Sequence, residues 1–252
     1  MTGCRIIWLD SIDSTNSEVK RNIDMLDNLT AIAAYEQTSG RGQRGNTWLT
    51  ESGKNLTFSI LIKYEEMQVI FKALNQFTIS EITALSVVEL LSGYGIDAMI
   101  KWPNDIYVDD RKICGILIEH SLKGESLSHS IVGIGLNVNQ TVFDPSLPNP
   151  TSMRSCLPDS AERLDPAELS EQFMGIFYRY LQRIFAGDSV RDLYLARLWK
   201  SGIESRFIDY TAEDSREFTG CIRGITEAGK LLIEDSETQQ LWDFWFKEVG
   251  FV

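Results

Sequence analysis

The stretch KWPNDIYVDDRKICGILIE, residues 101–119, contains the pattern from which much of the fold can be predicted. The apolar run 97–102 stops at Pro103, which favours the end of a strand because proline has no backbone N–H to donate. Residues 105–108 and 111–120 are two further apolar and β-branched runs, and the two aspartates between them are typical of a hairpin turn. The stretch therefore predicts three consecutive short strands, with polar side chains gathered at the first turn.

The remaining strands and helices are predicted from the same periodicities. Apolar, β-branched runs predict strands at 4–9, 30–37, 55–62 and 129–139. Helical spacing predicts one helix that begins at Thr15, with Glu18 completing a capping box, and two long helices over 67–95 and 165–185. Residues 140–160 are rich in proline and serine and predict a long loop, and 190–200 extend the helical region. We therefore predict an α+β domain over about residues 1–200.

A second, smaller domain is predicted at the carboxyl end of the chain. From about residue 205 the sequence changes to short alternating runs separated by turn residues. Four or five such strands in so short a segment indicate a small β-barrel, so we place this domain at residues 205–252.

Composition and charge exclude several classes of protein. The 252-residue chain has a formal net charge of −12, whereas a non-specific nucleic-acid binder is usually basic, so we expect no nucleic-acid partner. No apolar run reaches the roughly 18 residues of a membrane span, and the amino terminus lacks the features of a signal peptide. The four widely spaced cysteines predict reduced, mostly buried thiols in a cytoplasmic protein.

The glycine loop SGRGQRGNTW, residues 39–48, predicts an anion site. It satisfies G-x-G-x-x-G, but no helix start follows it, which argues against a dinucleotide fold. It also lacks the Gly-Lys-Ser/Thr of a Walker A loop, and the chain lacks later kinase motifs. What remains is a loop that carries Arg41 and Arg44, whose planar guanidinium groups suit carboxylates and phosphates, beside Trp48, an aromatic face on which a base can stack.

The turn within 101–119 supplies the other groups that an adenylating enzyme needs. Lys101, Asn104 and Asp105 surround Pro103, and Lys112 begins the next strand. A carboxylate that attacks the α-phosphate of ATP needs cations to neutralise both anions, and Mg²⁺ to bridge phosphates, often through one carboxylate. The two lysines are candidate cations and Asp105 the candidate carboxylate, although a single surface lysine is more often only solvated.

Together these motifs give the chain a specific resemblance. STN (14–16), EQTSGRGQRGNTW (36–48), residues 101–119 and GIGLNVN (133–139) occur in the order found in biotin–protein ligases, also called biotin–[acetyl-CoA-carboxylase] ligases, which the chain resembles over nearly its whole length. The resemblance implies a mixed sheet with helices on one side, of the class II synthetase type, followed by an SH3-like β-barrel. It also suggests a monofunctional ligase without an amino-terminal DNA-binding domain.

The resemblance implies a two-step reaction and a set of site residues. Biotin and MgATP give biotinyl-5′-AMP, which then acylates one lysine of a biotin carboxyl carrier domain. Lys112, Asp105 and Arg41 are the implied catalytic residues, and whether Asp105 is a base or a Mg²⁺ ligand stays open. The implied biotin site comprises Ser14, Thr15, Asn16, Gln37, Gly40, Arg41, Lys112, Gly115 and Gly133, and the implied ATP or adenylate site comprises Arg44, Trp48, Lys101, Asn104 and Asn137.

Several alternatives stay open at the level of sequence. A lipoate or octanoate ligase or transferase shares the catalytic scaffold, and a biotin-binding sensor without catalysis is a second alternative. Trp242, Phe244 and Trp245 are interpreted as core residues of the small domain, the alternative being contact with ATP or the carrier. Relatives often form homodimers, which makes a homodimer possible here.

One departure from the family pattern generates a prediction. The glycine loop is often G-R-G-R-R-G-R-x-W, and here Gln43 and Asn46 replace two arginines. The first of these arginines helps to hold the adenylate, so we hypothesise that this chain releases its adenylate faster than arginine-bearing members, unless another cation compensates. A chase of preformed adenylate measures the release rate; an unchanged rate in Gln43→Arg would contradict the hypothesis.

Overall fold

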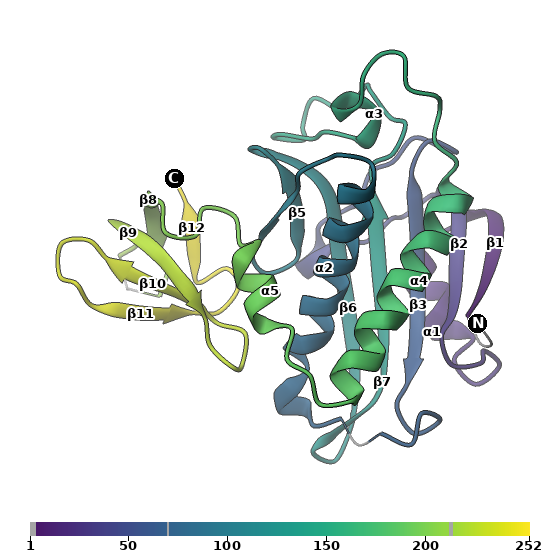
Figure 1. The fold of residues 1–252 in the computed structure, drawn as a ribbon, viewed down its shortest axis with the longest axis horizontal. Helices are drawn as coiled ribbons and strands as arrows, with labels where there is room; N and C mark the ends of the chain where they lie inside the picture. Colours follow the sequence, from purple (N-terminus) through teal and green to yellow (C-terminus); the bar gives the residue numbers. More distant parts are fainter. Residues whose placement is uncertain (1–3, 70, 212–213) are drawn as a thin grey trace.

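The computed structural model describes residues 4–69, 71–211 and 214–252, except for the side chains of Arg44 and Leu74. It consists of a seven-stranded sheet with helices and a separate five-stranded sheet (Figure 1). The strands of the first sheet are β1 (Arg5–Ile12), β2 (Thr30–Gln37), β3 (Leu56–Lys63), β4 (Met99–Lys101), β5 (Asp105–Val108), β6 (Arg111–Lys123) and β7 (Ser126–Leu136). The α-helices are α1 (Thr15–Arg21), α2 (Phe77–Gly93), α3 (Met153–Cys156), α4 (Pro166–Phe185) and α5 (Arg191–Ala196).

The large sheet is mixed, as predicted. Its strand order is β1-β2-β3-β7-β6-β5-β4, in which β1 and β2 are parallel and every other pair is antiparallel. The two long helices α2 and α4 lie in front of one face in Figure 1. In α4 the buried residues Leu169, Phe173, Phe177 and Leu181 recur every four residues, so one stripe of the helix packs on the core.

The interior strand β3 contributes side chains to both faces of the sheet. Phe58, Ile60 and Ile62 belong to the main core under α2 and α4, whereas Leu61 packs with Val19 of α1 in a smaller cluster. Because side chains alternate along a strand, α1 covers the opposite face from the long helices. That second face, which the short α1 covers in part, is where the polar side chains of the candidate site gather.

Two helix predictions are corrected by the structure. The helix expected over 67–95 begins only at Phe77, because the backbone of 71–73 bonds instead to the β6–β7 hairpin, through Leu127 N to Phe71 O at 2.8 Å and Ala73 N to Glu125 O at 2.9 Å. The expected capping box in α1 is also absent. Ser14 occupies the N-cap position, and Thr15 and Glu18 bond to other side chains.

The second sheet contains β8 (Glu204–Asp209), β9 (Arg216–Ile225), β10 (Leu231–Asp235), β11 (Leu241–Phe244) and β12 (Val249–Phe251). Its order is β11-β10-β9-β8-β12 and all of its pairs are antiparallel, which fits the small SH3-like unit expected. The interpretation of Phe244 as a core residue is confirmed, since it is buried. The same interpretation of Trp245 is wrong, since it is 45% exposed.

The cysteines are less buried than the sequence predicts. All four cysteines are free, but only Cys114 is buried, and Cys4 is exposed just before the edge strand β1. Within the described ranges, no helix combines the length and apolar character needed to cross a bilayer.

Candidate active site

The site is built on the face of the sheet that carries α1. A cavity of about 120 Å³ is formed there by the start of α1, the end of β2, the glycine loop, and the middle of β6 and β7. We call residues 39–48 the flap. These segments converge on one cavity together with Asn104, Asp105 and Phe246, and it contains most of the residues singled out by the sequence.

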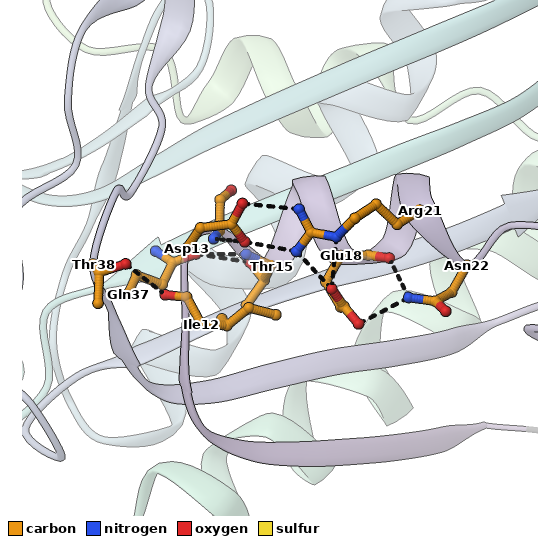
Figure 2. A network of polar contacts seen from close by, with 9 residues as sticks. Ile12, Asp13, Thr15, Glu18, Arg21, Asn22, Gln37 and Thr38 are labelled. Atoms are coloured by element: carbon orange, nitrogen blue, oxygen red, sulfur yellow. Dashed lines mark hydrogen bonds and ion pairs between the residues drawn. The ribbon is translucent and has the colours of Figure 1, made fainter.

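The start of α1 is fixed by an ionic network. Arg21 donates to both oxygens of Asp13, at 2.7 and 2.8 Å, and to Glu18, as Figure 2 shows. The hydrogen bonds from Arg21 and from Ser14 N hold the pKa of Asp13 well below its usual range. This network lies just outside the cavity and orients the Ser14–Asn16 turn toward it.

A chain of hydrogen bonds connects that turn to β2 and β3. Gln37 Oε1 accepts from the backbone N of Thr15 at 2.8 Å and from its hydroxyl at 3.1 Å (Figure 2). Ser59 Oγ lies 2.7 Å from Thr15 Oγ1 and 2.5 Å from Asn16 Oδ1. Because Ser14, Thr15, Asn16 and Ser59 are buried, these bonds preset the directions of their remaining donors and acceptors.

Glycines let side chains from other segments lie directly on the sheet. A Cβ atom at Gly133 would lie 2.2 Å from Asn16 Oδ1, and one at Gly135 would lie 2.4 Å from the Trp48 indole. A Cβ at Gly115 would also meet Trp48, at 3.0 Å. The three glycines therefore form a flat floor, on which Asn16 and Trp48 rest; the Trp48 Nε1 is buried there with no hydrogen-bond partner among the described residues.

The flap is closed on itself and tied to β6. Gly42 N donates to Asn46 O at 2.7 Å and Trp48 N to Gly40 O at 2.9 Å. The guanidinium of Arg41 makes two 3.2 Å contacts with the Glu119 carboxylate, which also accepts from Asn16 Nδ2 at 2.8 Å. Glu119 thus joins the flap to the polar wall of the cavity.

Lys112 and Asp105 form an ion pair of 2.7 Å at the far end of the cavity. Lys112 and Gly115 are three residues apart, so in a regular strand they would face opposite sides. The β5–β6 pairing shifts between Ile106 and Tyr107, placing Tyr107 opposite Lys112 and Asp105 opposite Gly115. This bulge turns Lys112 onto the face of the glycine floor.

A second cavity of about 470 Å³ adjoins the first. The two share Asn46, Thr47, Trp48, Asp105 and Lys112, and the second is completed by Asn137 and the loop around Leu147–Pro150. The Lys112–Asp105 pair therefore stands where the two cavities meet. A cation in that position can contact one anion from each side.

Comparison with known proteins identifies the family. The model of the biotin/lipoate A/B protein ligase family matches residues 8–137, just over half of the chain. The chain belongs to this family.

Individual members of the biotin/lipoate ligase family match over nearly all of the chain. The biotin--[acetyl-CoA-carboxylase] ligase of Paracoccus denitrificans is 27% identical over 238 residues, covering 91% of this chain and 94% of that protein. The bifunctional ligase/repressor BirA of Escherichia coli (strain K12) is 29% identical over 244 residues, covering 96% and 73%. The structure of a biotin protein ligase from Aquifex aeolicus in complex with biotin and ATP superposes with a TM-score of 0.78 at 26% identity, covering 98% of each chain.

The structure brings most of the residues expected from the family resemblance to the two cavities. Asn104 lines the first cavity while its amide donates to Ile116 O at 2.6 Å, and Asn137 lines the second while its amide donates to Thr151 O at 2.8 Å. Gly40 lies beneath Trp48, since a Cβ there would lie 2.3 Å from the Trp48 carbonyl. The side chain of Arg44 lies outside the described residues.

Lys101 is the residue that the structure places elsewhere. Its ammonium donates to Tyr107 OH at 3.1 Å and lies 5.2 and 5.5 Å from the ring centroids of Trp199 and Phe251. It lines neither of the two cavities. This aromatic surround, which includes a residue of β12, holds the ammonium away from the two cavities, so its expected position on the phosphate side stays a prediction.

Four residues of the site were missed by sequence reasoning: Ser59, Glu119, Gly135 and Phe246. Alternation gave a signal for two of them, because Gly135 follows Gly133 at a spacing of two and Glu119 follows Gly115 at a spacing of four. Ser59 lies in an apolar run, and Phe246 lies in the carboxyl-terminal unit, so neither carried a signal.

The Arg41–Glu119 contact predicts how firmly the flap is held. Glu119→Gln keeps an acceptor for Asn16 but removes the charge that pairs with Arg41, so we expect trypsin to cleave within residues 39–48 several-fold faster, in line with a loss of about 1 kcal/mol for a partly exposed pair. Glu125→Gln, an exposed position in the β6–β7 hairpin, is the matched control. Equal cleavage rates in the two variants would show that the Arg41–Glu119 ion pair does not hold the flap.

Proposed function

We propose that this protein is an ATP-dependent biotin–protein ligase that forms biotinyl-5′-AMP and transfers biotin to one lysine of a biotin carboxyl carrier domain. The observation that carries this proposal is the position of Lys112 and Asp105 at the junction of two cavities, one with a preset polar wall and a glycine floor, the other open to a larger ligand. Relatives named as biotin ligases, and an Aquifex aeolicus ligase with biotin and ATP bound, support it.

The two cavities suit the two small substrates. We place the biotin ring system against Ser14, Thr15, Asn16 and Gln37, whose fixed hydrogen-bonding groups match a ureido ring, above Gly115 and Gly133. The adenosine then occupies the second cavity beside Trp48 and Asn137. The biotin carboxylate and the α-phosphate meet at Lys112.

In the first step, an oxygen of the biotin carboxylate attacks the α-phosphorus, and the bond to the β-phosphate breaks to release pyrophosphate. Two unit negative charges brought to about 4 Å repel by about 4 kcal/mol at an effective dielectric of 20. Lys112 offsets this repulsion if its ammonium leaves Asp105 and bridges the two anions, with Arg41 closing the flap above. Mg²⁺ bound to the ATP phosphates would supply further charge neutralisation, and Asp105 is the carboxylate that would help to hold it.

In the second step, the acceptor amine attacks the carbonyl carbon of the adenylate, the bond from that carbon to the AMP oxygen breaks, and an amide forms. The amine must be neutral to attack and must lose a proton afterwards. Once Lys112 has turned to the ligand, the Asp105 carboxylate is free to orient the amine or to accept its proton. One ion pair thereby serves both steps.

The proposal also covers the roles of the two domains and the compartment of the protein. We assign the catalytic role to about residues 1–200 and treat residues 205–252 as a separate small domain. We place the protein in the cytoplasm, where the free thiols Cys4, Cys114, Cys156 and Cys221 stay reduced.

The direct test is mass spectrometry of a carrier domain incubated with this protein, biotin and MgATP. We expect a biotin-sized mass increase on one lysine, unaffected by excess lipoate or octanoate. A lipoyl or octanoyl adduct in its place would assign the chain to the other branch of the family. Biotin binding without biotin-dependent ATP–pyrophosphate exchange would indicate a non-catalytic biotin sensor.

Substitution of Lys112 tests the role of the junction. Lys112→Ala removes the bridging charge from the transition state, so we expect adenylate formation to fall by at least about 100-fold. Biotin affinity should fall less, by under about tenfold, because the ureido contacts remain. Lys123→Ala, an exposed lysine on the same strand, is the control. Near-normal turnover of Lys112→Ala would refute the assignment.

A further inference from the structure

A loop of the carboxyl-terminal sheet contacts the turn that presents Asp105. Trp102 Nε1 donates to the carbonyl of Gly229 at 2.8 Å, and Gly229 lies in the loop between β9 and β10. Trp102 is in the β4–β5 hairpin, where Lys101 pairs directly with Asp105. Only one hairpin turn therefore separates a contact made by the small unit from the candidate catalytic carboxylate.

The Gly229 carbonyl is held in a fixed position. Gly229 has φ +92°, a conformation that favours glycine, and a Cβ there would lie 2.4 Å from the Phe77 ring at the start of α2. The loop is closed by Thr226, whose carbonyl accepts from Gly229 N at 3.0 Å and whose hydroxyl accepts from Lys230 N at 3.1 Å. The acceptor for Trp102 therefore belongs to a tight turn packed against a helix of the large domain.

An ion pair between partly buried Arg191 and buried Glu81 anchors the same loop. Arg191 Nε lies 2.5 Å from the carboxylate of Glu81, which is 2% exposed, while Arg191 Nη1 donates to the carbonyls of Ile225 and Thr226 at 3.3 and 2.7 Å. Because a buried charge that loses its partner is strongly destabilising, this arrangement holds the loop to α2.

The β4–β5 hairpin is held between this loop and β6. On the side of β6, Ile116 N donates to Asn104 O at 3.0 Å and the Asn104 amide donates back to Ile116 O at 2.6 Å. On the other side lie the Gly229 carbonyl and the ring of Phe246, whose centroid is 6.3 Å from that of Trp102 and which lines the first cavity. Displacing the loop would release one of the contacts that hold the hairpin on which Asp105 lies.

We propose that the Gly229 carbonyl of the carboxyl-terminal unit fixes Trp102 and thereby positions Asp105 against Lys112. Trp102 and Gly229 are positioning residues, since they act through the hairpin and not on substrate. The inference rests on the proposed ligase function and assigns a role to a domain whose contribution the sequence left open.

The test measures the single-turnover rate constant of biotin-dependent adenylate formation, with pyrophosphate release as the readout. Trp102→Phe removes the indole N–H and keeps an aromatic ring. We expect the rate constant to fall about tenfold, because a small displacement of a catalytic group is enough for such a loss. The amplitude, which counts correctly folded enzyme, and the KM for biotin should stay within about twofold of the wild type.

Trp242→Phe is the matched control. Trp242 lies in the small unit, and its Nε1 is buried with no hydrogen-bond partner among the described residues. It lines none of the cavities around Lys112 and Trp102. We expect its rate constant to equal that of the wild type. Gly229→Ala displaces the same contact from the opposite side and should lower the rate constant by a similar factor.

The double variant shows whether the two substitutions act on one contact, and the amplitudes show whether a variant has only lost folded enzyme. Trp102→Phe combined with Gly229→Ala should be no slower than the slower single variant, because both remove one contact. A rate constant in Trp102→Phe within twofold of the wild type, a loss confined to the amplitude, or multiplicative effects in the double variant would overturn the proposal. Failure of the wild-type protein to form any adenylate would instead refute the ligase function, and this inference with it.

Discussion

The site depends on one charge pair, Lys112 with Asp105, held 2.7 Å apart where two cavities meet. A strand of regular register would turn Lys112 to the opposite face from Gly115, and only the bulge in the β5–β6 pairing brings the ammonium to the cavity side. In this structure each charge neutralises the other. In the proposed reaction, Lys112 turns to the two anions and leaves the Asp105 carboxylate beside the reacting carbonyl, as the candidate base or Mg²⁺ ligand.

The rest of the site keeps the surroundings of that pair rigid and accessible. Glycines at 115, 133 and 135 remove the side chains that would otherwise separate Asn16 and Trp48 from the sheet. The buried bonds among Thr15, Gln37 and Ser59 fix donors and acceptors before any ligand binds, which reduces the ordering that binding requires. Glu119 connects this polar wall to the flap through Arg41, so closure of the flap and the arrangement of the wall share one carboxylate.

The sequence predicts much of the fold because most of its strands are local patterns. The run 105–108 is observed as β5 and 30–37 as β2 with unchanged bounds, since short apolar runs and the turn residues that follow them determine both locally. The sequence did not predict the features that depend on contacts between residues far apart in the chain. Helix α2 does not begin before Phe77 because residues 71–73 bond to the β6–β7 hairpin, and Lys101 turns to Phe251, more than a hundred residues away. The bulge that orients Lys112 depends on the pairing of β5 with β6. The place of Phe246 in the first cavity depends on packing between the two domains. No single segment of sequence predicts either.

The most direct measurement of the central claim is a crystal structure of the protein with a non-hydrolysable analogue of biotinyl-5′-AMP. The account predicts that the Lys112 ammonium leaves Asp105 and lies within hydrogen-bond distance of both the acyl and the phosphoryl oxygens. The ring system should rest on Gly115 and Gly133, and the adenine should lie in the cavity beside Asn137. A complex in which Lys112 stays paired with Asp105 and the acyl–phosphoryl linkage lies away from both would contradict it.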